Sequence, residues 1–298
     1  MYATVLDTNV LRGLSSQRFA ELNEKERDRA VRPYADPWTL MELIAQLQHP
    51  TSADYRPCRE ALRRAAARAL LPLCNSPRMI APSELQITRL VFGGASKDQE
   101  DNVSAFVELT RSLGTADPSD DLAEFRTDIR SVSDHVYRKE KWFTEYFVNL
   151  RQQVLNATKS ATNRQRNKAV RNWTRSETAM RLDAEALIRR AYSQVNQTVP
   201  EPIPSNIVDG VLIMTRPGSC AAALVLERIL CDDIDLEKSR HRNLMWDLEI
   251  SASVGQTVDG VPIVIVTDDA YFAEAARLAG HPSAVCTLDA YLVRLGNH

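Results

Sequence analysis

The chain has 298 residues, of which 44% are hydrophobic and 26% are charged, and its formal net charge is −2 at pH 7. These values are typical of a folded globular protein with enough chain for one large domain or two ordinary ones, and they exclude a disordered chain. The five cysteines are odd in number and far apart, which favours reduced, buried thiols over disulfides or a zinc site.

The sequence shows no signal for secretion or for a membrane. The N-terminus has no basic leader and enters a strand directly, and no apolar run approaches the roughly 18 to 20 residues of a membrane span. We therefore expect a cytoplasmic protein without membrane contact.

A short apolar run opens the chain. Residues 2–6 predict a buried strand of the parallel type, which ends on the carboxylate of Asp7. Alternating charges crowd residues 18–32 and predict a solvated helix. Further elements are expected over residues 38–47 (an apolar helix), 59–71 (a helix lined by arginines) and 78–81 (a short strand).

The character of the sequence changes from about residue 96 to residue 199. Glycine is nearly absent after Gly114, and the pattern is helical with polar linkers. Residues 96–135 contain 4 Lys/Arg against 10 Asp/Glu, whereas residues 136–181 contain 11 Lys/Arg against 3 Asp/Glu. This segment predicts a helical insertion or a small second domain.

Three closely spaced prolines (Pro200, Pro202 and Pro204) end this segment, because clustered prolines interrupt regular structure. Residues 207–214 are compatible with a strand or with the start of a helix. The clearest strand covers residues 261–266 and is followed by Thr267-Asp268-Asp269. The remaining elements are helices over residues 218–231, 243–254, 270–278 and 288–295, and a short strand over residues 284–286.

Strands alternate with helices at both ends of the chain. This arrangement indicates an α/β protein whose parallel sheet is built from the two chain termini. We therefore divide the chain into a core in two parts, residues 1–95 and 200–298, which is interrupted by the insertion 96–199.

Four acidic positions lie at comparable places on these elements. Asp7 and the pair Asp268-Asp269 follow strands, whereas Glu42 and Asp247 interrupt apolar helices. Ligands of open α/β sheets gather outside the carboxyl ends of the strands, and carboxylates are rarely buried unless they are paired or bind metal. Oxygen ligands without Cys or His suit Mg²⁺ or Mn²⁺, and such sites typically hydrolyse phosphodiesters.

With these segments the chain resembles the PIN-domain ribonucleases, a family related to the toxin nucleases of bacterial toxin–antitoxin pairs. The resemblance is carried, in the family's order, by Val5-Leu6-Asp7-Thr8-Asn9-Val10-Leu11, Trp38-Thr39-Leu40-Met41-Glu42-Leu43, Asn243-Leu244-Met245-Trp246-Asp247-Leu248-Glu249-Ile250-Ser251-Ala252 and Ile265-Val266-Thr267-Asp268-Asp269-Ala270-Tyr271-Phe272. It covers residues 1–90 and 205–298, and it implies a three-layer α/β/α fold with a central parallel sheet. The departure from the family is the length of chain between Glu42 and Asp247, about 200 residues.

The resemblance also implies the roles of individual residues. The acids that bind Mg²⁺ or Mn²⁺ and serve catalysis would be Asp7, Glu42, Asp247 and Asp269. Asn9 and Thr267 would hydrogen-bond to these carboxylates and fix their orientation. Asp268 would be an N-terminal residue of the following helix. In the family, a metal-activated water attacks phosphorus without a protein nucleophile.

Two segments are candidates for contact with RNA, the basic stretch 138–175 and the arginine-lined helix 59–68. From them we select as substrate-binding candidates Arg59, Arg63, Lys168 and Arg171. The alternative is an amphipathic helix pair with solvated charges, and the helical spacing of Phe143, Tyr146 and Phe147 favours a core position for these aromatics, with Trp142 beside them. A second acidic group (Asp232, Asp233 and Asp235) is expected to be a solvated helix end rather than a metal site.

Several functions compete at this point. The leading prediction is a divalent-metal-dependent endoribonuclease. The alternatives are a catalytically idle scaffold that binds RNA, an antitoxin or another protein through the insertion, and a structure-specific DNA nuclease. A phosphatase with Asp7 as nucleophile is disfavoured, because that chemistry usually requires a second Asp where this chain has Asn9. The oligomeric state stays open, with a homodimer as one alternative.

Overall fold

A mixed α/β architecture with a mainly parallel sheet is seen in the computed structural model, which describes residues 2–71, 78–117, 121–231, 234, 236 and 244–296. Within these residues the strands are β1 (Ala3–Leu6), β2 (Arg32–Tyr34), β3 (Thr257–Val258), β4 (Val261–Val266) and β5 (Val285–Cys286). Their order is β2-β1-β4-β3, and β5 also pairs with β4. Only β3 is antiparallel to its neighbour.

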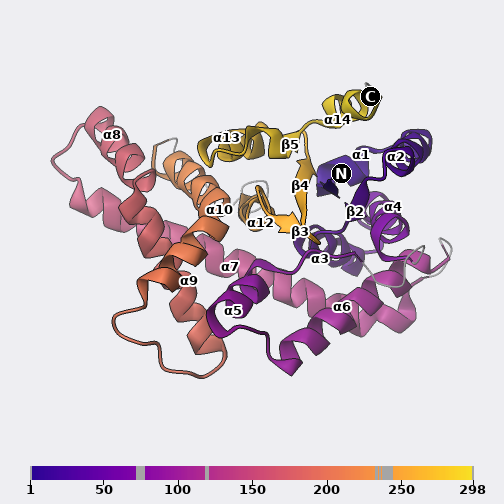
Figure 1. Cartoon of the computed structure of the whole chain (residues 1–298), viewed down its shortest axis with the longest axis horizontal. Coiled ribbons are helices and arrows are strands. Elements are labelled where there is room, and N and C mark those ends of the chain that lie inside the picture. The colour runs from indigo at the N-terminus through magenta and orange to yellow at the C-terminus, as the bar shows by residue number, and fades with distance from the viewer. Residues whose placement is uncertain are drawn as a thin grey trace.

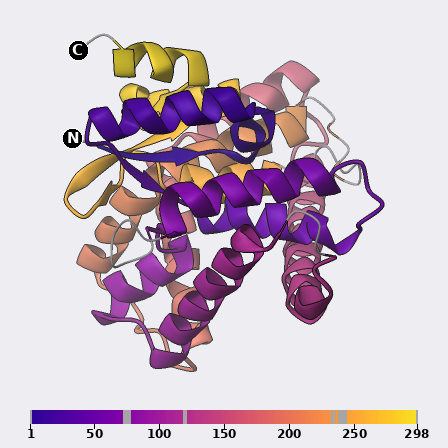
Figure 2. The same ribbon diagram turned by 90° about the vertical axis from the view of Figure 1, so that its right-hand side faces the viewer.

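The two ends of the chain meet in this sheet, as predicted. Leu6 of β1 is level with Val266 of β4, so both strands end at the same edge. The protein has separate hydrophobic core clusters on the two faces of β1. Val5 belongs to one cluster and Leu6 to another, because successive side chains of a strand point to opposite faces. Figure 2 shows the C-terminal helix α14 (Leu288–Gly296), in yellow, beside the N-terminal helix α2 (Ser16–Asp28), in indigo.

The first part of the chain adds elements that the sequence pattern did not predict. Its helices are α1 (Thr8–Gly13), α2, α3 (Pro37–Ala45), α4 (Tyr55–Ala65) and α5 (Ser83–Phe92). Neither β2 nor α5 was expected, and the strand predicted over residues 78–81 is a single bridge between Ala35 and Met79. The charged helix α2 is largely exposed, but Glu26 is 2% exposed and is therefore not solvated as predicted.

The predicted helical character of residues 96–199 is confirmed. This segment contains α6 (Lys97–Thr115), α7 (Arg126–Ala157), α8 (Asn163–Thr174) and α9 (Glu177–Gln194). Ser96 caps α6 and Thr162 caps α8, each in a capping box with a glutamine three residues later. Phe143 and Phe147 of α7 belong to the same core cluster as Val5 of the sheet. The insertion therefore shares a core with the α/β part.

A single long helix, α10 (Ser205–Cys231), replaces the strand considered for residues 207–214. Val208, Val211 and Thr215 are buried at helical spacing, which explains why this apolar stretch is not a strand. By length and composition α10 could cross a membrane, although half of its apolar window is buried inside the protein. It packs against α8, α9, α12 (Leu244–Ser251) and α13 (Ala270–Leu278), which makes it a central helix of the fold (Figure 1).

Candidate active site

An aspartate follows each of the parallel strands β2, β1 and β4, and each aspartate caps the next helix. Asp7 accepts a hydrogen bond from the backbone N–H of Thr8, and Asp269 accepts one from that of Tyr271 at 2.8 Å. Asp36, after β2, accepts two, at 2.9 and 3.1 Å. Capping satisfies otherwise unpaired N–H groups and fixes each carboxylate at the start of its helix. The parallel pairing of β1 with β2 and β4 then places the three carboxylates at one edge of the sheet.

Asp7 lies at the centre of this edge and is 4% exposed. Its Oδ2 accepts a 3.0 Å hydrogen bond from the hydroxyl of Thr267, whose oxygen in turn accepts from the backbone N–H of Asp269 at 3.1 Å. Burial raises the pKa of Asp7, and the negative charge of Asp269 raises it further. Thr267 therefore links the acids that follow β1 and β4.

Glu42 of α3 reaches the same place through Thr8. The Thr8 hydroxyl donates to Glu42 Oε2 at 2.6 Å, while the Thr8 backbone N–H donates to Asp7. Burial raises the pKa of Glu42 to about 7, and the charge of Asp7 contributes to this shift. The sequence reasoning missed Thr8, although a hydroxyl directly after a strand acid is a detectable signal.

Asp247 of α12 completes the set and is half-buried. Burial raises its pKa to about 8, with repulsion from Asp269, Asp7 and Glu42 adding to the shift, whereas Arg228 lowers it. Four acids from four elements thus share one electrostatic neighbourhood. Among the described residues, however, no three His, Cys, Asp or Glu side chains form a group tight enough to hold a metal ion.

A fifth acid, Asp36, was missed because the proline after it was interpreted only as a break. It is 2% exposed, and burial raises its pKa to about 7, with smaller contributions from Glu249 and Asp7. Glu249 of α12 accepts hydrogen bonds from Ser83 at 3.0 Å and Lys139 at 3.3 Å. The Lys139 ammonium of α7 also lies 3.6 Å from the ring centroid of Trp38. These contacts fix the insertion beside the acidic site.

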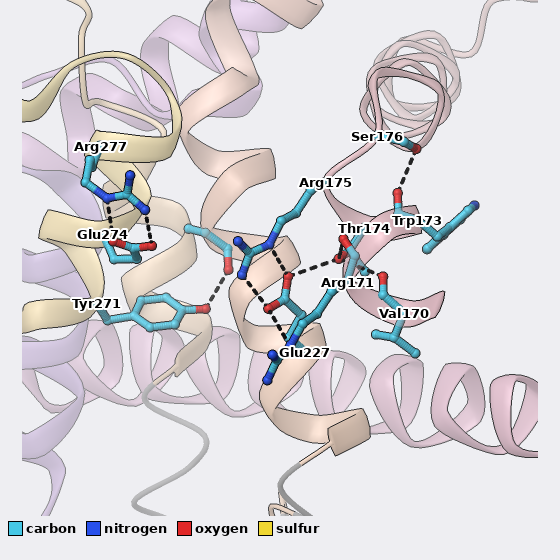
Figure 3. Close-up of polar contacts among 11 residues, drawn as sticks. Val170, Arg171, Trp173, Thr174, Arg175, Ser176, Glu227, Tyr271, Glu274 and Arg277 are labelled. Atoms are coloured by element: carbon cyan, nitrogen blue, oxygen red, sulfur yellow. Dashed lines mark hydrogen bonds and ion pairs between the residues drawn. The ribbon is translucent and has the colours of Figure 1, made fainter. Parts of the chain in front are cut away.

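Two further contacts bring the insertion and α10 to the site. Glu140 of α7 accepts a 3.2 Å hydrogen bond from the indole N–H of Trp246, and its charge raises the pKa of Glu42. The hydroxyl of Tyr271 donates to the backbone carbonyl of Ala221 on α10 (Figure 3). Burial and the charge of Asp247 raise the pKa of Tyr271, so this phenol stays neutral.

Other residues predicted from the resemblance lie differently from expectation. The side chain of Asn9 is exposed, and its backbone N–H, rather than its amide, hydrogen-bonds to Asp7. Asp268 is exposed and precedes the helix, because Asp269 is itself the N-cap of α13. The second acidic group (Asp232, Asp233 and Asp235) lies outside the described residues.

The substrate-binding candidates separate into two kinds. Arg59 is 6% exposed and donates to the carbonyl of Asp117, which corrects its assignment as an RNA contact, and Arg63 pairs with Glu60 at 3.1 Å. Lys168 and Arg171 are exposed. Arg171 lies 3.8 Å from Glu227, which holds Arg175 through two 2.6 Å hydrogen bonds (Figure 3).

The aromatic residues of α7 also fall into two groups. Phe143 and Phe147 are buried, as the core interpretation predicted. Trp142 and Tyr146 are instead 54% and 48% exposed and stack on each other with ring centroids 5.5 Å apart.

In comparisons with known proteins, no family model, curated protein or solved structure matches this chain.

Proposed function

We propose that this protein is a divalent-metal-dependent endoribonuclease with a PIN-like, three-layer α/β/α core and an inserted helical segment over residues 96–199. The observation that carries the proposal is the convergence of four carboxylates from four elements at the carboxyl edge of the sheet. In this proposal the metal-holding residues are Asp7, Glu42, Asp247 and Asp269. Thr8 and Thr267 orient them through the hydrogen bonds described above.

The chemistry of the donor set fits Mg²⁺ or Mn²⁺. All four side chains offer hard oxygen donors, and burial, with mutual repulsion added to it, raises the pKa of three of them. Such a set gains free energy when a divalent cation neutralises it. Bound there, the ion would supply an activated water and stabilise negative charge on the phosphodiester. The exposed Arg228, which lowers the pKa of Asp247, would attract the phosphate of the substrate.

Labelled single-stranded RNA and DNA, incubated with the protein in Mn²⁺ or in EDTA, test the proposal. We expect RNA cleavage that EDTA abolishes and that Asp269→Asn reduces by at least about 100-fold, because the ligand charge is lost. Asn caps helices as well as Asp, so the fold should persist. The matched control is Asp268→Asn, whose exposed side chain lies next to the site. Cleavage in EDTA, or equal loss in both variants, would contradict the proposal.

A scaffold without catalysis is the second candidate. It is favoured by the exposed side chains of Lys168 and Trp142 in the insertion, a cation and an aromatic ring that would contact RNA without cleaving it. RNA binding without cleavage, unchanged by Mn²⁺ and by Asp269→Asn, would support the scaffold over the nuclease. Cleavage of DNA in preference to RNA would instead indicate the DNA nuclease.

A further inference from the structure

A pocket of about 280 Å³ opens between α7, α8, α9 and α10. None of its lining residues belongs to the acidic site. Its floor is apolar and includes Phe147, Ala223 and Leu226, which are buried. Its volume is close to the lower end of the range for small-molecule sites, which indicates a small ligand rather than a protein segment.

The main polar group of the pocket is the carboxylate of Asp183 on α9. Its Oδ2 accepts a 2.9 Å hydrogen bond from Ser219 of α10, and the side chain remains open to solvent. The surrounding apolar groups raise the pKa of Asp183 by desolvation. In the described part of the chain no Lys, Arg or His pairs with it. A ligand that brings a positive charge would therefore supply the missing partner.

Two exposed aromatic side chains line the same pocket. Tyr146 and Trp173 line it and are 48% and 49% exposed. Rings of this kind attract cations through their negative faces, and Arg190 already lies 5.5 Å from the ring centroid of Trp142, which stacks on Tyr146. Aromatic faces beside a carboxylate form a site suited to an ammonium group.

The neighbouring arginines of α8 do not neutralise Asp183. Glu227 holds Arg175 through two 2.6 Å hydrogen bonds and lies 3.8 Å from Arg171. In Figure 3, Trp173 points away from this ion pair. The pocket side therefore keeps a negative charge of its own, which disfavours a phosphate-bearing ligand such as a nucleotide.

We propose that this pocket binds a small organic cation, a primary or methylated ammonium group on an aliphatic stem. The stem packs on the floor formed by Phe147 and Leu226, and the ammonium lies near Asp183 and the rings of Tyr146 and Trp173. This site is separate from the acidic site and does not depend on the ribonuclease proposal.

Calorimetric titration of the full chain with n-hexylamine and with 1-hexanol tests this proposal. The two probes have similar apolar stems, but only the amine is charged. We expect hexylamine to bind at one site with a Kd below about 1 mM and hexanol to bind at least about tenfold more weakly. Asp183→Asn should weaken hexylamine binding by about tenfold or more. The matched control, Asp209→Asn on α10, removes the same charge at an exposed position outside the pocket and should leave binding unchanged.

A second variant, which blocks the pocket sterically, tests the proposal even if Asp183→Asn does not fold. Ala186 lines the pocket and is exposed, so Ala186→Trp should fold normally and block both probes. The proposal would be overturned by a lack of saturable hexylamine binding, by equal binding of hexanol, or by equal weakening in Asp183→Asn and Asp209→Asn. Displacement of hexylamine by single-stranded RNA would also overturn it and would assign the aromatic rim to base stacking.

Discussion

The hydroxyl of Thr8 donates a 2.6 Å hydrogen bond to Glu42. Thr8 belongs to the helix that follows β1 and Glu42 to the helix that follows β2, so this bond joins two elements at the edge of the sheet. Because the backbone N–H of Thr8 also donates to Asp7, one residue fixes two of the four proposed ligands.

Removing this hydroxyl should weaken the site without unfolding the protein. We expect Thr8→Ala to lower Mn²⁺ affinity by about 10- to 100-fold, since a carboxylate loses the partner that orients it. The loss of stability should be about 1 kcal/mol. Calorimetric Mn²⁺ titration and urea unfolding measure the two effects. Thr8→Ser keeps the hydroxyl and should bind Mn²⁺ within about threefold of the natural protein. Equal affinity in Thr8→Ala would contradict the orienting role.

The raised pKa values predict how stability depends on pH in the absence of metal. Asp36 and Glu42 have pKa values of about 7 and Asp247 of about 8, whereas unfolded carboxyls titrate near pH 4. Between these limits the folded protein binds more protons than the unfolded chain. The contribution of these three groups to the free energy of unfolding is therefore fully present at low pH, and it is lost as the pH rises through their folded pKa values. The melting temperature in EDTA should therefore fall from pH 5 to pH 8.

Variant Asp247→Asn provides the control for this pH dependence. Its amide cannot ionise, so the fall in melting temperature over the same range should be smaller than in the natural protein. Each kcal/mol of difference in the free energy of unfolding shifts the melting temperature by roughly 2–4 °C for a protein of about this size. A melting temperature that rises with pH in EDTA, or an identical slope in the variant, would argue against the shifted pKa values.

The elements that the sequence predicted well carry their own signals. β4 is a continuous apolar run, and α13 begins at Ala270, as expected. β2 gave no such signal, because its three residues, Arg32–Tyr34, become a strand only by pairing with β1. Asp36 was missed because Pro37, directly after it, was interpreted only as a break. Likewise, the charge pattern of α4 could not indicate that Arg59 would be buried against the carbonyl of Asp117, a contact distant in sequence.

Removing one partner of a buried ion pair next to β1 should destabilise the fold strongly. Arg68 and Glu26 have side chains that are each 3% exposed, and Glu26 also accepts hydrogen bonds from Thr4 at 3.0 Å and Tyr291 at 2.7 Å. Arg68→Met leaves Glu26 buried without its cation, so we expect a loss of about 3–5 kcal/mol in urea unfolding.

The control lies within the same arginine-lined segment. Arg63 forms a partly exposed pair with Glu60, and Arg63→Met should change stability by less than about 1 kcal/mol. If Arg68→Met were as mild as Arg63→Met, the arginine row would be a solvated face, and its use for RNA contact would regain support.

The crossing of α6 with the turn after α4 requires a glycine. A Cβ added at Gly114 would lie 2.3 Å from the Cβ of Ala66, so Gly114→Ala forces the two segments apart. We expect a loss of about 1–3 kcal/mol in urea unfolding. Ala66→Gly should recover part of that loss in the double variant, because it removes the opposing methyl group. Gly13→Ala, where nothing lies within 4 Å, should have little effect. Equal stability of Gly114→Ala and Gly13→Ala would show that α6 does not pack this closely on the turn after α4.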